Sequence, residues 1–148
     1  MTSEATRERT LVPLREGMFR TPGRLDSPAG LLGDRCRNCG EAFFPRRVFC
    51  AACSSGDMED VEFPSMGTIE TFTIVRQQPP NSVMEPPYAI VRVRIDNGPS
   101  VQTVVPAEDV RGVGIGGRAE LLVRRLKEDE AGNTVVSFMA RPIDQQER

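Results

Sequence analysis

Histidine is absent from this sequence of 148 residues, and lysine and tyrosine occur once each, as Lys127 and Tyr88. Without imidazole, the chain cannot form a Ser-His or Cys-His nucleophilic pair or a histidine metal site, and no side chain has an ordinary pKa near neutrality. Schiff-base chemistry has Lys127 as its single candidate, in a charged stretch. These absences argue against a catalytic role and leave no residue that we assign as catalytic.

Long apolar runs are also missing. No stretch approaches the roughly 18 apolar residues of a membrane span, and the first ten residues, MTSEATRERT, lack the apolar core of a signal peptide. We therefore expect a cytoplasmic protein without membrane contact. Tryptophan is absent and the net charge is −2, with a pI of about 5.3. Because a nucleic-acid surface is normally basic, this balance argues against nucleic acid as a partner.

The four cysteines form two Cys-x-x-Cys pairs separated by ten residues: Cys36, Cys39, Cys50 and Cys53. This spacing is typical of a rubredoxin-like, four-cysteine zinc ribbon, in which each pair makes a tight turn that directs two thiolates at one metal ion. Four thiolates leave no open coordination position, so the sequence predicts a structural Zn²⁺. Iron is the alternative metal, and two disulfides are the alternative in an oxidising compartment.

Beyond the ribbon, the residue pattern is that of strands. Five segments alternate or are rich in β-branched residues: Gly67–Val75, Tyr88–Ile95, Ser100–Val105, Arg118–Leu126 and Thr134–Arg141. Residues 106–110 have room for a helical turn between the third and fourth strands. This order predicts a five-stranded OB-fold barrel, and a small open sandwich or an SH3-like barrel is the alternative with similar periodicity.

The apolar residues of segment 11–19 recur at loosely helical spacing, which predicts a short N-terminal helical segment after a disordered lead-in at residues 1–10. This segment is too small to fold alone, so we expect it to pack on the ribbon or to lie along a partner. The predicted organisation is mainly β, with a lead at 1–33, the zinc ribbon at 34–63 and the OB-fold domain at 64–148.

Two groups of residues are candidates for contact with a ligand. Arg46 and Arg47 of the ribbon can each hold a phosphate or carboxylate through paired hydrogen bonds, and Phe44 lies beside them in sequence. A place in the small ribbon core is the alternative role of Phe44. Met84 lies in the proline-rich loop 77–87 between the first two barrel strands, and Tyr88 follows that loop; both are candidates for an acyl pocket. A stiff surface loop is the alternative there.

The motifs follow one another in a specific order: residues 32–40 and 44–53 with the cysteine pairs, then 67–73, Pro86-Pro87-Tyr88 and Gly114-Ile115-Gly116. In this order they resemble the family of zinc-ribbon/OB-fold proteins associated with acyl-CoA enzymes, long filed as a domain of unknown function. The resemblance covers residues 11–143. Ala51 and Ser100 stand where members of the family often have Pro and Arg.

The resemblance implies an accessory subunit that forms a hetero-oligomer with an acyl-CoA enzyme, such as a thiolase, a related aldolase, a hydroxymethylglutaryl-CoA synthase or an enoyl-CoA hydratase. Residues 14–19 resemble the lead segment of members that accompany thiolase-fold enzymes. Such members help to complete the partner's CoA channel, which implies a CoA thioester as a shared ligand.

A single-stranded nucleic-acid-binding protein is the alternative from another class, because zinc ribbons and OB barrels both serve that function. It requires basic grooves and exposed aromatic rings for stacking. In this sequence Arg92 and Arg94 by themselves give only a short basic stripe.

Overall fold

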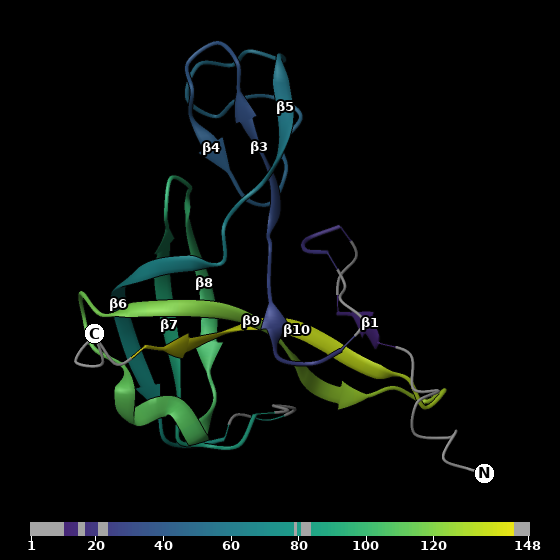
Figure 1. Cartoon of the computed structure of the whole chain (residues 1–148), viewed down its shortest axis with the longest axis vertical. Coiled ribbons are helices and arrows are strands. Elements are labelled where there is room, and N and C mark those ends of the chain that lie inside the picture. The colour runs from purple at the N-terminus through teal and green to yellow at the C-terminus, as the bar shows by residue number, and fades with distance from the viewer. Residues whose placement is uncertain (1–10, 15–16, 21–23, 79, 81–83, 144–148) are drawn as a thin grey trace.

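The computed structural model describes residues 11–14, 17–20, 24–78, 80 and 84–143, so the expected lead-in at 1–10 lies outside the described part. Its elements, labelled in Figure 1, are β1 (Leu11–Pro13), β2 (Ser27–Pro28), β3 (Leu32–Cys36), β4 (Ala42–Phe43), β5 (Met58–Glu62), β6 (Met66–Val75), β7 (Tyr88–Ile95), β8 (Ser100–Val105), the 3₁₀ helix η1 (Ala107–Gly112), β9 (Arg118–Glu128) and β10 (Thr134–Pro142). The strands form two sheets, with the orders β4-β3-β5 and β1-β10-β9-β6-β7-β8, and β2 pairs with β9.

The small sheet is the ribbon, and it projects from one end of the larger, curled sheet (Figure 1). Its central strand β3 pairs antiparallel with β4 and β5, and Asp34 lies opposite both Phe43 and Asp60. Gly33 is required for this packing, because a Cβ there would lie 2.2 Å from the backbone oxygen of Phe43. β3 ends at Cys36, so the turn that carries the first cysteine pair begins at the end of this strand.

The five predicted barrel strands all form, as β6 to β10, and β7 and β8 have the expected bounds. In β7 the alternation predicted from the sequence is observed: Ala89, Val91, Val93 and Ile95 are buried, whereas Arg92 and Arg94 are exposed. Buried residues from all five strands meet in one core, which contains Ile69, Val105, Leu121 and Val136. Burial of these apolar side chains is the main contribution to the stability of the barrel.

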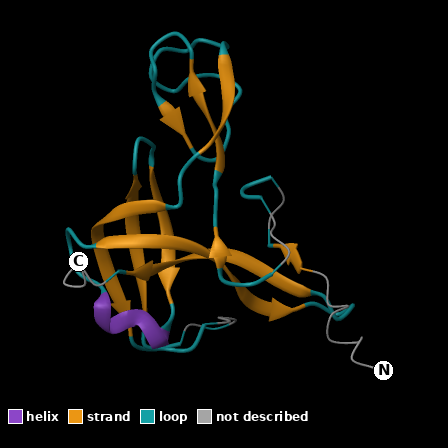
Figure 2. Ribbon diagram, in the orientation of Figure 1, coloured by secondary structure: helices purple, strands orange, loops and turns teal. Residues whose placement is uncertain are grey.

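Strand β6 pairs with both β7 and β9, and η1 connects β8 to β9 (Figure 2). On the opposite side of the barrel, Thr103 Oγ1 of β8 donates a hydrogen bond to Phe138 O of β10 at 2.9 Å. This arrangement confirms the OB-fold prediction. No helix in residues 11–143, as far as they are described, is long and apolar enough to cross a membrane.

The N-terminal segment differs from the short helix expected for it, because its described residues are extended. β1 pairs in parallel with β10, and Leu14 N–H donates to Val136 O at 2.8 Å. Gly17 has a φ of 85°, a left-handed conformation that interrupts a right-handed helix. Pro13 lacks the N–H that a helix interior needs, whereas the edge of β10 offers backbone partners to an extended segment.

The lead packs on the barrel and also contacts the ribbon, one of the two arrangements expected from the sequence, because Arg20 pairs with Glu62 of β5. Ala29 and Leu31 are fully buried in the barrel core. The ring of Phe138 contacts Phe19 of the lead edge-on at 6.1 Å and Phe44 of the ribbon at 5.7 Å, between ring centroids. These three rings therefore join the lead, the ribbon and the barrel.

Candidate functional site

The ribbon brings the four predicted cysteine thiols together. Their Sγ atoms all lie within 4.8 Å of one another, and the pairs Cys36–Cys53 and Cys39–Cys50 are 3.6 Å apart. A disulfide requires about 2.05 Å, so these thiols are not bonded to each other. Four sulfurs at bond lengths of about 2.3 Å around Zn²⁺ form a tetrahedron with edges of about 3.8 Å. The observed spacing therefore fits one tetrahedral metal ion.

The backbone of each turn is shaped to support thiolates. Cys39 N–H points at Cys36 Sγ and Cys53 N–H points at Cys50 Sγ, each at 3.4 Å. Such N–H groups stabilise negative charge on sulfur. Gly40, the residue after the first cysteine pair, has a φ of 86°, a left-handed conformation that glycine adopts without strain. Each turn therefore supports its own sulfurs through backbone N–H groups of nearby residues.

The acidity of the thiols is uneven. Asn38 Nδ2 donates to Cys53 Sγ at 3.3 Å, and this bond, with one from the Ser55 backbone, lowers the pKa of Cys53 to about 6. A hydrogen bond from the Glu41 backbone lowers the pKa of Cys39, but the neighbouring Cys50, Cys53 and Cys36 thiols and partial loss of hydration outweigh it and raise that pKa to about 12. Because thiolates bind metal ions, a metal ion must displace protons from the cluster as it binds.

This donor set determines the chemistry of the site. Four sulfurs occupy all four coordination positions of a tetrahedral metal ion, so no position remains for water or substrate. Cys36 and Cys50 are buried beneath the turns, while Cys39 is exposed. A metal ion held there links β3 to the second cysteine pair and stabilises the fold without entering a reaction.

The two ribbon arginines proposed as ligand contacts are already engaged within the ribbon. Arg46 Nε lies 3.3 Å from Asp60 Oδ1, and the Arg47 guanidinium lies 5.2 Å from the centre of the Phe43 ring. Arg47 N–H also donates to Oδ2 of the buried Asp34 at 2.8 Å. Both arginine side chains remain on the surface, and neither lines the cavities of about 740, 470 and 520 Å³ formed by described residues.

The aromatic candidates are packing residues. Phe44 is half-buried against the ring of Phe138 of β10, so it packs at the junction with the barrel and not in a core of the ribbon alone. Tyr88, at the start of β7, is only 7% exposed. Met84 lines a cavity of about 470 Å³ together with residues 106–108 at the start of η1. The helix η1 lies at the end of the barrel away from the ribbon (Figure 1). The structure therefore does not bring the candidates of the ribbon and those of the loop into one pocket.

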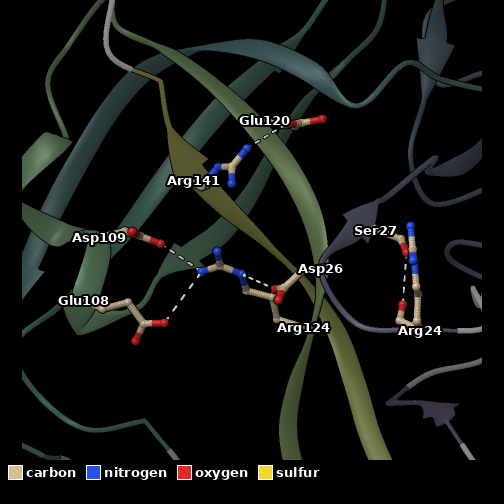
Figure 3. Close-up of polar contacts among 8 residues, drawn as sticks. All are labelled: Arg24, Asp26, Ser27, Glu108, Asp109, Glu120, Arg124 and Arg141. Carbon is tan, nitrogen blue, oxygen red and sulfur yellow. Dashed lines mark hydrogen bonds and ion pairs between the residues drawn. The ribbon is translucent and has the colours of Figure 1, made fainter.

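Arg124 of β9 borders the same cavity and is surrounded by carboxylates (Figure 3). It lies 3.1 Å from Asp26 and 2.8 Å from Asp109, and Glu108 is 4.0 Å away. The Arg124 side chain is 16% exposed, so these ion pairs are partly buried and tie the lead and η1 to the barrel. They also neutralise the Arg124 guanidinium.

A second hollow, of about 740 Å³, lies between the ribbon and the β7–β8 hairpin. Arg35 of the ribbon and Arg92 and Arg94 of the barrel line it together with residues 40–42 and 97–100. The alternation of β7 was enough to place Arg92 and Arg94 on its outer face. Their proximity to Arg35 had no signal in the sequence, because it depends on how the ribbon lies against the hairpin.

Comparison with known proteins gives the same two modules. Residues 30–59 match the family description "ChsH2, rubredoxin-like zinc ribbon domain", and residues 60–124 match "ChsH2, C-terminal OB-fold domain". A DUF35 domain-containing scaffold protein of Pyrococcus furiosus is 32% identical over 114 residues, which cover 76% of this chain and 83% of that protein. Its counterpart in Methanocaldococcus jannaschii is 28% identical over 116 residues, covering 77% and 82%.

A solved structure named "Ltp2-ChsH2(DUF35) aldolase" matches with a TM-score of 0.56 and 23% identity, over 76% of this chain and 84% of that one. At this level of identity the match shows a shared fold. The order of a zinc ribbon followed by an OB-fold domain, expected from the motifs, is therefore confirmed.

Proposed function

Because the chain belongs to the family of DUF35 domain-containing scaffold proteins, with a ChsH2-type zinc ribbon and OB-fold domain, we propose that it is a non-catalytic accessory subunit of a complex that processes acyl-CoA thioesters. Family membership carries the proposal, since relatives of similar length are named scaffold proteins. The solved structure with the same fold is named as an aldolase that joins Ltp2 to a DUF35 protein. We infer that the partner is a thiolase-fold or related acyl-CoA enzyme and that the two form a hetero-oligomer.

The chemistry of the chain supports this division of labour. Carbon-carbon bond formation or cleavage next to a thioester needs a nucleophile or base with a tuned pKa. This chain has no histidine, and its four cysteines lie in one cluster suited to a metal ion. Asp26 and Asp109 are paired with Arg124 (Figure 3). Catalysis therefore belongs to the partner.

The resident metal in this proposal is Zn²⁺, held by Cys36, Cys39, Cys50 and Cys53. It supplies structural stability and no reaction step, because four thiolates complete its coordination. The reducing cytoplasm is the compartment in which four such thiols stay available for metal.

The proposal also includes a share in the partner's acyl-CoA channel, with the CoA thioester as a ligand of the complex. Met84 is the residue we expect to contact the acyl group, since its cavity is partly apolar and flexible methionine adapts to irregular surfaces. Arg46 and Arg47 remain exposed enough to contact the enzyme, while Phe44 and Tyr88 support these surfaces from within the fold.

Co-expression with thiolase-fold enzymes of the same organism tests the proposal. We expect one stable complex in size-exclusion chromatography with light scattering, one zinc per chain, and enzyme activity that needs the complex. Arg46→Ala with Arg47→Ala should weaken complex formation while zinc stays bound. The matched control is Arg76→Ala with Arg111→Ala, which removes the same charge from exposed positions elsewhere.

Two results would overturn the proposal. One is full activity of the enzyme without this chain and no complex at micromolar concentrations. The other is tight, salt-sensitive binding of the isolated chain to single-stranded DNA or RNA, which would favour the nucleic-acid function instead.

A further inference from the structure

The hollow between the ribbon and the β7–β8 hairpin is lined by three guanidinium groups. Arg92 and Arg94 point outward from β7, two residues apart and thus on the same face. Arg35 enters from β3 of the ribbon. The site therefore exists only when both modules are folded and in contact, and each contributes positive charge to it.

Two carboxylates oppose these three arginines, so the charge in the hollow is only partly neutralised: Glu41 lines the hollow itself, and Glu70 pairs with the barrel arginines. Glu70 of β6 is the acidic partner of both barrel arginines, at 3.4 Å from Arg92 and 3.5 Å from Arg94. These contacts are long, and Glu70 also accepts a hydrogen bond from Ser100 Oγ at 2.8 Å. The two arginine side chains are 57% and 65% exposed, so both can reorient toward a stronger anion.

Arg35 is fixed in place by neutral groups. Its Nη1 donates to Gly40 O at 3.0 Å and its Nη2 donates to Asn97 O at 2.8 Å. These two bonds connect the exit of the first cysteine turn with the turn of the β7–β8 hairpin. A carbonyl oxygen orients a guanidinium without cancelling its charge, so Arg35 contributes a positioned positive charge to the wall of the hollow.

We propose that this hollow is a binding site for an organic phosphate, and that its ligand is the phosphate-bearing end of an acyl-CoA thioester. The identity of the ligand rests on the proposed function, whereas the site rests on the geometry. Guanidinium groups match phosphate oxygens through paired hydrogen bonds. A ligand with several negative charges is needed to draw Arg92 and Arg94 away from Glu70.

The lining of the hollow separates this ligand from an oligonucleotide. The hollow is open to solvent, and its volume of about 740 Å³ is within the range of small-molecule sites. The outer face of these two strands is where OB folds also bind oligonucleotides. Such binding relies on aromatic rings that stack with bases, and none of the described lining residues is aromatic.

The test uses the full chain loaded with zinc, with calorimetric titration of coenzyme A, ADP, inorganic phosphate and a single-stranded oligonucleotide. We expect coenzyme A to bind and inorganic phosphate to compete weakly. Arg92→Ala with Arg94→Ala should weaken coenzyme A binding about a hundredfold, at about tenfold for each lost charged contact. Arg92→Lys with Arg94→Lys, which keeps charge but loses the paired geometry, should give an intermediate loss.

Arg76→Ala with Arg111→Ala is the matched control and should bind coenzyme A as the native chain does. The inference is overturned if coenzyme A does not bind at millimolar concentration, if the Arg92 and Arg94 variant binds equally well, or if the oligonucleotide binds more tightly than coenzyme A. The first two results leave the proposed function standing when the partner complex still forms. If the chain binds coenzyme A but forms no complex with the enzyme, the proposed scaffold function is wrong and the proposed binding site is supported.

Discussion

Replacing Phe44 with alanine separates a packing role from a ligand role at the junction of the ribbon and the barrel. Phe44 is half-buried and meets the Phe138 ring edge-on, at 5.7 Å between centroids and an interplanar angle of 82°. A fully buried Phe→Ala change costs about 3–5 kcal/mol, so the half-buried ring should cost about 2 kcal/mol. About 1 kcal/mol of this belongs to the edge-on ring contact, which Phe44→Leu would also lose.

The measurement is urea unfolding followed by circular dichroism, with zinc in excess and held constant. With a urea dependence of about 2 kcal/mol per molar, the unfolding midpoint should fall by about 1 M for Phe44→Ala and by half of that for Phe44→Leu. Phe49→Ala is the matched control, because Phe49 is 62% exposed, and its midpoint should stay within about 0.2 M of the native value. Below the unfolding transition, binding of coenzyme A and of the partner should be unchanged.

The reasoning is refuted if Phe44→Ala unfolds at the native urea concentration but loses affinity for coenzyme A or the partner. In that case Phe44 contacts a ligand directly, and its contact with Phe138 contributes little to stability.

Two further perturbations test the metal site and the ion pairs. Removal of metal by a chelator should raise hydrogen exchange in β3, β4 and β5 while β7 stays protected, because the ribbon depends on its metal and the barrel on its apolar core; an unchanged ribbon would contradict a structural metal. Two hydrogen bonds from Arg118, at 2.7 and 2.9 Å, lower the pKa of Asp96. Their stabilisation is therefore complete above the unfolded pKa of about 4 and is lost as pH falls through the lowered value. With Asp96→Asn, the urea unfolding midpoint should fall less steeply as the pH is lowered below about 4. An unchanged pH dependence would mean that other carboxylates cause the loss of stability in acid.

The local parts of the fold were predictable because their signals are local. The spacing of the four cysteines defines the two turns, and each turn satisfies its own sulfurs through nearby N–H groups. The alternation in β7 reports which side chains face the core, since one face of that strand is buried. The same reasoning gave the bounds of β8 and the approximate bounds of β6, β9 and β10.

The N-terminal segment shows where local pattern fails. Its apolar spacing is compatible with a helix, but the open edge of β10 pairs with Leu11–Pro13 and draws the segment into the larger sheet. A partner strand that is more than a hundred residues away in sequence leaves no periodicity in the segment itself. Tertiary contact therefore overrides a weak helical preference.

The sequence by itself determined the composition of the metal site, the exclusion of histidine chemistry and the order of the modules, because these depend on residue identity and short spacing. Only the tertiary structure decided which arginines face a hollow and which are occupied by acidic or aromatic neighbours. Arg46 and Arg47 stand out in sequence, yet Asp60 and Phe43 engage them. Arg35 acquires its position from Asn97, across the junction of the ribbon and the barrel. Such contacts form between residues brought together by folding, so their physical cause lies in packing and not in the local sequence.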